Sequence, residues 1–341
     1  MSKTKTSRAA VLRGFDELVS ELGGDPVEVA AAAGLELAQF RDPDTLLPID
    51  PLFQILTLSA RATGCDHFGL ELARRRDLSN YLGILGDIGR SAATVGDALT
   101  ELFSLMSIHS EATLWQLRRE GEVGYVIFSL LDESGGSYKQ VEQLVITIFW
   151  RFTDLLAQHQ WHPTMVAFTF AKPKDFQVYR RVFDVPIVFD AEFCGVVFHS
   201  SDLDIELPRH NKGQHDKLHA VARGIRDSKP RNLSEEVRTL IRKNLELHLV
   251  GEEYLTQFFP YEKRTLQRKL KAQGTSYREL LHEVRIVMAM ELLAASDMPV
   301  TRIAERLCYS DVANFTKAFS QHAGVPPTTW RTQIKGAFDP D

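Results

Sequence analysis

Apolar residues recur with helical spacing at both ends of the chain, and the middle departs from this pattern. The first part, residues 8–75, predicts helices over AAVLRGFDELVSELG, DPVEVAAAAG and PIDPLFQILTLSARATG. Each of these segments ends at or just before a glycine, the usual helix stop. The pair Asp25-Pro26 supplies an N-cap followed by proline at the first helical position. A further helix is predicted from Thr94 to Ser107.

The middle of the chain combines strand and helix patterns. The segments EATLWQLRR and YVIFSLL flank the turn EGEVG, so residues 111–131 predict a β-hairpin. Short apolar runs (MVAFTF, PIVF and CGVVFHS) are typical of buried strands, with a helix expected over DFQVYRRVF. An amphipathic helix is predicted from Lys139 to Gln158, and Pro208 to Ile225 is predicted as a closing helix. We therefore expect this region to be α+β.

The C-terminal part contains one pattern twice. In each copy a short helix leads through a tight turn into a second helix with basic and polar side chains. Leu266 and Leu270 in the first copy correspond to Phe315 and Phe319 in the second, at a constant offset of 49 residues. This repetition predicts two helix-turn-helix units, which are devices for reading DNA because the second helix fits a major groove about 12 Å wide.

The two units are expected at about residues 251–274 and 299–324, joined by a long linker helix. Ser276 and Glu279 have the spacing of a capping box before a helix over Tyr277–Ala295, which would span roughly 28 Å. That length approaches the roughly 34 Å between successive major-groove faces. We expect its apolar stripe to pack both units and to fix their spacing.

Each second helix has an outward face once its apolar pair is turned inward. In the first unit the outward residues are Arg264, Gln267, Arg268 and Lys271. In the second unit they are Val312, Ala313, Thr316 and Lys317. Arginine suits guanine, glutamine suits adenine, lysine suits phosphate, and small apolar side chains suit the thymine methyl group. We therefore expect the first unit to carry more base specificity.

Length and charge support a division into two domains. A chain of 341 residues exceeds what one core usually holds. The polar segment RDSKPRNLS suggests a sensing or dimerising domain over 1–228, a linker over 229–233 and a DNA-binding domain over 234–335. The net charge is −5, but residues 229–341 hold 17 Lys and Arg against 14 Asp and Glu. The basic half therefore suits contact with phosphates.

Other classes of protein receive little support. The three cysteines, Cys65, Cys194 and Cys308, lie far apart and predict free thiols in a reducing cytoplasm. No apolar stretch is long enough for a membrane span, and no secretory signal is present. Nucleotide-binding, zinc-protease and serine-hydrolase motifs are absent, so we expect no enzyme and no cofactor. An enzyme domain fused to a DNA-binding tail remains a remote alternative.

Residues 234–331 closely resemble the DNA-binding domain of AraC/XylS-type bacterial transcription regulators. The matching stretches are RTLQRKLKAQGTSYRELLHEVR, IAERLCYSDVANFTKAF and the ending GVPPTTWR. The chain departs from the family at the tight turns, where glycine is usual and Pro260 and Cys308 stand here. Glu262 also replaces the usual serine N-cap, and Lys317 replaces a common arginine.

The N-terminal half resembles the effector-binding and dimerisation domain of one branch of the same family, through ELGGDPVEVAAAAGL, YLGILGDIGRSAATVGDALTEL and VFDVPIVFDAEFCGVVF. This resemblance implies a cytoplasmic, nucleoid-associated homodimer that binds double-stranded operator DNA, a small organic effector and RNA polymerase. An N-terminal half that serves only protein interaction is the alternative. The family includes activators, and the direction of regulation depends on where the operator lies.

Several residues of the N-terminal half are candidates for an effector site. Aromatic residues of the middle region are expected mainly as ordinary core and secondarily as the wall of an apolar pocket: Trp115, Phe128, Trp150, Phe168 and Phe170. Polar residues that could orient an anionic ligand are His109, Tyr138, Lys139 and Arg151. His215 and His219 have the spacing of a metal pair, although a solvated helix face is favoured over a metal site. The run Arg74-Arg75-Arg76 is likewise expected to be solvated.

Overall fold

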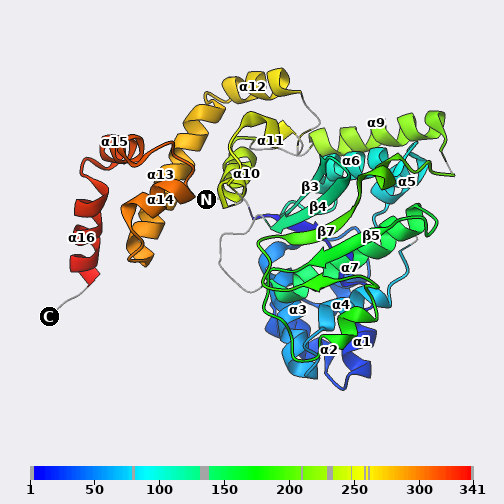
Figure 1. Ribbon diagram of the computed structural model, residues 1–341. Helices are drawn as coiled ribbons and strands as arrows, with labels where there is room; N and C mark the ends of the chain where they lie inside the picture. The colour runs from blue at the N-terminus through cyan, green and yellow to red at the C-terminus, as the bar shows by residue number, and fades with distance from the viewer. Residues whose placement is uncertain are drawn as a thin grey trace. The chain divides into compact units, whose positions relative to one another are not determined.

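The chain divides into two compact units, Met1–Lys229 and Pro230–Asp341. The computed structural model describes residues 4–78, 81–130, 138–208, 210–228, 233–246, 248–256, 259 and 262–338 (Figure 1). The first unit combines helices with two sheets, and the described part of the second unit contains only helices. The expected combination of an α+β region and a helical region is confirmed.

The larger sheet of the first unit has the strand order β3-β4-β7-β5-β6. Its strands are β3 (Thr113–Glu120), β4 (Val123–Leu130), β5 (Pro163–Ala167), β6 (Ile187–Val188) and β7 (Cys194–His199). β3 and β4 form the predicted hairpin, and Gly121 at its turn has φ +60°, a conformation that favours glycine. The PIVF run forms only a two-residue strand, which pairs in parallel with β5.

The helices of the first unit surround this sheet. They are α1 (Phe15–Glu21), α2 (Pro26–Ala32), α3 (Ile49–Thr63), α4 (Phe68–Arg74), α5 (Ile84–Ser91), α6 (Val95–Leu105), α7 (Lys139–Leu156), α8 (Gln177–Arg180) and α9 (Lys212–Ser228), with short 3-10 turns η1 (Ala9–Leu12), η2 (Leu37–Phe40), η3 (Met106–Ile108) and η4 (Ser200–Asp204). α7 contacts β7 of the sheet and also α3 and α4 (Figure 1). A second group forms where α5 contacts both α6 and α9.

The predicted amphipathic helix from Lys139 to Gln158 is α7 (Lys139–Leu156), and most of its residues are buried. Its polar residues Glu142, Gln143 and Thr147 are buried together with its apolar ones. The Glu142 carboxylate accepts from the Thr169 backbone N–H at 3.0 Å, and Gln143 Nε2 donates to Tyr179 Oη at 2.6 Å. Burial raises the pKa of Glu142. A helix buried all round needs such partners for its polar groups.

The N-terminal segment contains strands that the helical pattern did not predict. β1 (Thr6–Arg8) and β2 (Leu46–Pro48) form an antiparallel pair, and Ser7 also bridges to Ser110. The first full helix, α1, begins only at Phe15. Residues 6–8 are thereby held beside the segment between α6 and β3, which is far away in the sequence.

Helices α10 to α16 make up the described part of the second unit. They are α10 (Leu233–Glu246), α11 (Glu252–Thr256), α12 (Lys263–Ala272), α13 (Tyr277–Ala295), α14 (Val300–Arg306), α15 (Val312–Ala323) and α16 (Pro327–Phe338). α10 contacts α11, α12 and α13, whereas α13 contacts α10, α15 and α16 (Figure 1). α10 therefore shares the packing role that the sequence analysis gave to α13 alone.

Side chains cap two of the described helices in this unit. The Ser276 hydroxyl accepts from the Glu279 N–H at 3.3 Å, which confirms the cap of α13. Asp311 caps α15, because its carboxylate accepts from the Asn314 N–H at 2.7 Å. This hydrogen bond also lowers the pKa of Asp311. Pro299 is the N-cap residue of α14.

Candidate nucleic-acid interface and cavity

The exposed face of α12 carries the four side chains that the sequence analysis selected. Leu266 and Leu270 are both 1% exposed and hold the helix against its own unit. Arg264, Gln267, Arg268 and Lys271 are all exposed, as are Lys263, Lys269 and Ala272 of the same helix. Glu262 precedes the helix as its N-cap residue but makes no side-chain cap hydrogen bond. Pro260, the other departure from the family at this end, lies outside the described residues.

Gln267 is held by a neighbour that sequence reasoning missed. Its Nε2 donates to Glu252 Oε2 at 2.6 Å, and Lys263 Nζ lies 3.6 Å from the same oxygen. Glu252 belongs to α11, fifteen residues earlier in the chain. Because one amide hydrogen is used in this bond, the orientation of the Gln267 amide is fixed. Its oxygen and its second N–H remain able to contact a base.

The corresponding face of α15 is less polar. Phe315 and Phe319 are both fully buried, and Phe319 packs edge-on against Trp330 with ring centroids 6.0 Å apart. Of the four selected residues, Val312, Ala313 and Lys317 are exposed and Thr316 is half-buried. The Asn314 side chain, also exposed, donates to Asp311 Oδ2 at 2.7 Å and stiffens the start of the helix.

The turn between α14 and α15 is tight, and its backbone explains why glycine is usual there. Cys308 has φ +56°, in the left-handed region that disfavours residues with a Cβ atom. Arg285 from α13 stabilises this turn, because its Nη2 donates to the Cys308 carbonyl at 2.6 Å. The Arg285 guanidinium also lies 4.6 Å from the centre of the Tyr309 ring.

The backbone strain at Cys308 gives a stability prediction. We expect Cys308→Gly to be more stable than Cys308→Ala by about 1 kcal/mol, since both lose the sulfur but only alanine keeps the Cβ atom at positive φ. Urea unfolding of the two variants, followed by helical circular dichroism, measures this difference. Equal stabilities would show that the left-handed conformation at residue 308 carries no cost.

The Trp-Arg pair at the end of the family motif has a structural role. Arg331 Nη2 donates to the Met298 carbonyl at 2.5 Å, and Trp330 contacts Phe319. These contacts attach α16 both to α15 and to the segment before α14.

The first unit contains a partly open cavity of about 70 Å³. Its wall comes from α3, α6, α7, β3 and the N-terminal segment, and the lining is almost entirely apolar. Trp115 stacks on Phe103 with ring centroids 5.3 Å apart, and Phe149 packs beside them. The described residues that line the cavity include no Asp, Glu, Lys or Arg.

The polar end of the cavity is formed by His109, Tyr81, Ser7, Ser110 and Thr113. Arg8 Nη1 donates to His109 Nδ1 at 3.4 Å, so His109 Nε2 carries the proton and donates to Tyr81 Oη at 3.2 Å. Burial, with smaller contributions from the positive charges of Arg8 and Arg76, lowers the pKa of His109 to about 3. The imidazole is therefore neutral near pH 7.

Of the residues that the sequence suggested for an effector site, only two line the cavity. Trp115 and His109 line the cavity, whereas four aromatic residues belong to the surrounding core and are not in its lining: Phe128, Trp150, Phe168 and Phe170. Lys139 pairs with Asp66 at 2.6 Å, and Tyr138 packs edge-on against Phe53. Arg151 donates to the carbonyls of Ala73 and Arg76 at 2.6 and 2.8 Å. None of these three side chains lines the cavity.

The arginine run at residues 74–76 is only partly solvated. Arg74 and Arg75 are exposed, but Arg76 is 5% exposed, so the prediction was wrong for this residue. Its guanidinium donates to the carbonyls of Ala10, Val11 and Arg13. It thus ties the end of α4 to the N-terminal segment.

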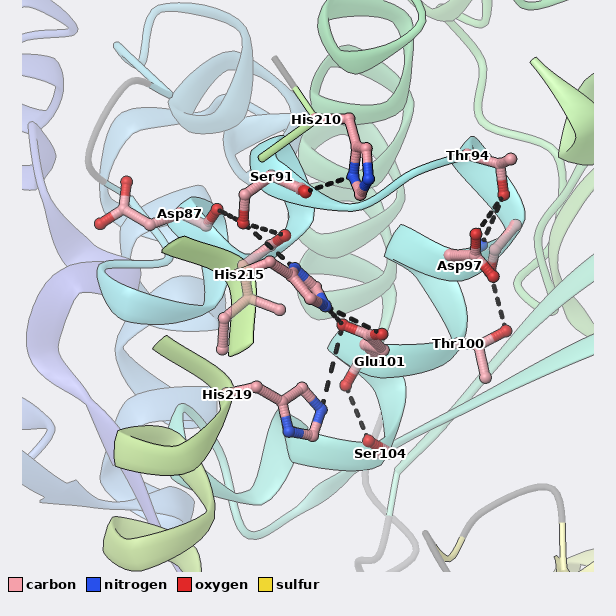
Figure 2. A network of polar contacts seen from close by, with 12 residues as sticks. Asp87, Ser91, Thr94, Asp97, Thr100, Glu101, Ser104, His210, His215 and His219 are labelled. Atoms are coloured by element: carbon pink, nitrogen blue, oxygen red, sulfur yellow. Dashed lines mark hydrogen bonds and ion pairs between the residues drawn. The ribbon is translucent and has the colours of Figure 1, made fainter. Parts of the chain in front are cut away.

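His215 and His219 pack against α6 and do not lie on a solvated face, so that prediction was wrong. Their side chains are 13% and 14% exposed. Figure 2 shows His215 between Ser91 and Glu101: its Nδ1 lies 3.2 Å from Ser91 Oγ, and its Nε2 lies 2.9 Å from Glu101 Oε2. His219 Nε2 lies 3.9 Å from the same oxygen. Burial raises the pKa of Glu101 and lowers that of His219. This network holds α9 against α5 and α6.

Two kinds of feature are absent from the described residues. No group of three or more His, Cys, Asp or Glu side chains there is arranged to hold a metal ion. Within the same ranges, no helix has the length and apolar content that a membrane crossing requires.

Known proteins match both units. Residues 23–207 match the N-terminal arabinose-binding domain of AraC transcription regulators, and residues 255–333 match a helix-turn-helix domain. With exposed basic side chains on α12, these matches define a DNA-binding transcription regulator. The chain belongs to the AraC family, in the branch that carries the arabinose-binding type of N-terminal domain.

Relatives extend over the whole chain. The transcriptional regulator VirS of Mycobacterium tuberculosis is 26% identical over 331 residues, which cover 95% of this chain and 96% of VirS. The ornithine utilization regulator of Pseudomonas aeruginosa is 24% identical over 287 residues, covering 82% of this chain and 83% of the relative. The crystal structure of the regulator CdpR from Pseudomonas aeruginosa has 20% identity and a TM-score of 0.45, and covers 93% of this chain and 97% of CdpR.

Proposed function

We propose that this protein is a sequence-specific transcription regulator that reads DNA with two helix-turn-helix units and responds to a small organic effector. The proposal that the protein reads DNA rests on a feature that α12 and α15 share. Each helix buries one apolar pair, Leu266 and Leu270 or Phe315 and Phe319, and exposes side chains suited to DNA on its other face. A helix built in this way fits a major groove.

The proposed contacts differ between the two helices. On α12, Arg264, Gln267 and Arg268 contact base edges while Lys271 contacts phosphate. On α15, Val312 and Ala313 meet thymine methyl groups, with Thr316 and Lys317 at the edge of the contact. α13, with 19 residues, and α10 set the spacing between the two helices. One chain thereby reads two neighbouring segments of the major groove.

Lys271 provides a test of the phosphate contact. We expect Lys271→Ala to weaken binding to all DNA sequences alike and to reduce the slope of log K against log salt by about one unit, because one fewer counterion is released. Fluorescence anisotropy over a salt series, with operator and random DNA, measures both effects. A loss confined to operator DNA would instead make Lys271 a base-reading residue.

Effector control acts through the first unit in this proposal. Binding shifts the population between arrangements of the two units or of two subunits, and so changes the spacing at which recognition helices meet DNA. The protein works in the cytoplasm on the nucleoid, as a homodimer with four recognition helices, and affects RNA polymerase at promoters beside its sites. This proposal is supported by the match to an arabinose-binding type of domain and by the cavity within that domain. Nothing in the described residues suggests catalysis as an additional role.

The first experiment is to sequence the genomic DNA fragments that the full-length protein retains at about 150 mM salt, where nonspecific binding is weak. We expect a motif of two major-groove elements one helical turn apart. Affinity for that motif is then measured with and without a mixture of sugars, amino acids, aromatic acids and alcohols. A single-element motif would contradict the two-unit interpretation, and an affinity unaffected by every mixture would contradict effector control.

A further inference from the structure

The cavity of the first unit has features that define the chemistry of its ligand. Its wall is apolar, and its described lining has no formally charged side chain. The two arginines near its polar end are already engaged. Arg8 donates to Asp44 Oδ1 through Nε at 2.9 Å and through Nη2 at 2.5 Å, and Arg76 donates to three backbone carbonyls. An anion placed in the cavity would lose its hydration without gaining an ion pair.

Hydroxyl groups remain available at the polar end. Thr113 Oγ1 is buried and has no hydrogen-bond partner among the described residues. Ser110 Oγ accepts from the Ala112 N–H at 3.4 Å, and Tyr81 Oη accepts from His109, which leaves both hydroxyl hydrogens to be donated. A buried hydroxyl without a partner costs stability, so its retention beside a cavity indicates a ligand that satisfies it.

We propose that this cavity binds a small, uncharged and mostly apolar molecule whose single oxygen, as in an alcohol or a ketone, is held by the hydroxyl of Thr113 with those of Ser110 and Tyr81. The inference rests on the proposed effector control and names the chemical class of the effector. The cavity has about half the volume of an engineered 150 Å³ cavity that takes benzene. The ligand is therefore short or slender.

The test uses two matched series of compounds on the full chain. The n-alkan-1-ols from propanol to octanol are compared with the alkanoates of equal length at pH 7, by thermal shift and by tryptophan emission. We expect the alcohols to raise the melting temperature, with the strongest effect at the shorter members, and the alkanoates to have no effect. The emission change should disappear in Trp115→Phe while the thermal shift remains, because Trp115 lies in the wall of the cavity.

Thr113→Val removes the hydroxyl and keeps the shape of the side chain. We expect it to weaken alcohol binding by about three- to tenfold while the ligand-free protein stays at least as stable as the wild type, since the lost hydroxyl has no partner among the described residues. Thr147→Val is the matched control. Thr147 also has a buried hydroxyl without a partner among the described residues, but it does not line the cavity. Alcohol binding should be unchanged in this control.

Three results would overturn the proposal: alkanoates that bind as tightly as alcohols, alcohol binding that is unchanged in Thr113→Val, or no binding of either series. Each of these measurements is made without DNA. Effector control is judged separately, from the change in operator affinity with the metabolite mixtures. If a sugar or an amino acid altered operator affinity while alcohols did not bind, the ligand class would be wrong and effector control would stand.

Discussion

Arg268→Ala is expected to weaken binding to the operator by about 1–3 kcal/mol, which corresponds to a loss of roughly 5- to 150-fold. Arg268 lies on the exposed face of α12, opposite the buried Leu266 and Leu270. Its side chain is exposed, so it is accessible to DNA. A bidentate contact from arginine to guanine O6 and N7 is the commonest specific contact in the major groove.

The measurement is a comparison of operator DNA with single-base variants by fluorescence anisotropy. We expect Arg268→Ala to bind all variants of one base pair with equal affinity, because the side chain that distinguished them is gone. Arg242→Ala is the control, since it removes the same charge from the second unit at a side chain that pairs with Glu291 on α13. Its operator affinity should stay near that of the wild type. Wild-type affinity in Arg268→Ala would show that α12 does not use this residue to read DNA.

His109 is expected to make the first unit less stable in acid, by about 2 kcal/mol between pH 7 and pH 5. The pKa of His109 is lowered to about 3 in the folded protein, mainly by burial, whereas an unfolded histidine has a pKa of about 6.5. Below pH 6.5 His109 is protonated in the unfolded chain but stays neutral in the folded protein. The stability is therefore complete above about pH 6.5 and is lost as the pH falls towards 3.

Urea unfolding at several pH values, followed by tryptophan emission, tests this dependence. Three of the four tryptophans, Trp115, Trp150 and Trp161, belong to the first unit and report on it. In the variant His109→Gln, we expect the free energy of unfolding to change much less between pH 7 and pH 5, whatever its value at pH 7. His219, whose pKa is also lowered, contributes with the same sign, and Glu101, whose pKa is raised, contributes with the opposite sign. If the free energy of unfolding of His109→Gln changed with pH as steeply as that of the wild type, His109 would not be the source of the pH dependence.

Secondary structure was predicted correctly where the caps, turns and apolar spacing that determine it lie within one short segment. The helix over Tyr277–Ala295 has the predicted bounds, because Ser276 and Glu279 cap it and its residues favour helix throughout. The hairpin of β3 and β4 follows from two alternating segments around the turn at Gly121. The paired burial of Leu266 with Leu270 and of Phe315 with Phe319 follows from helical spacing alone.

Predictions failed where a distant segment supplies the environment of a side chain. Arg76 looks solvated within its arginine run, yet residues 10–13 supply the carbonyls that it binds. His215 looks like part of a solvated helix face, yet Ser91 and Glu101 lie against it (Figure 2). Gln267 was correctly expected on the exposed face of α12, but its bond to Glu252 could not be inferred from spacing.

The order of elements and the apolar pairs of α12 and α15 are encoded locally, through hydrogen bonds and spacings within a few residues. The family also follows from sequence motifs. The cavity and its uncharged polar end arise only when β1, α6, β3 and α7 pack together, which brings residues 7, 109, 113 and 149 around one space. Desolvation then keeps His109 neutral, and the packing leaves the hydroxyl of Thr113 without a partner among the described residues. Desolvation depends on which atoms surround a group in space, and linear sequence spacing does not contain that information.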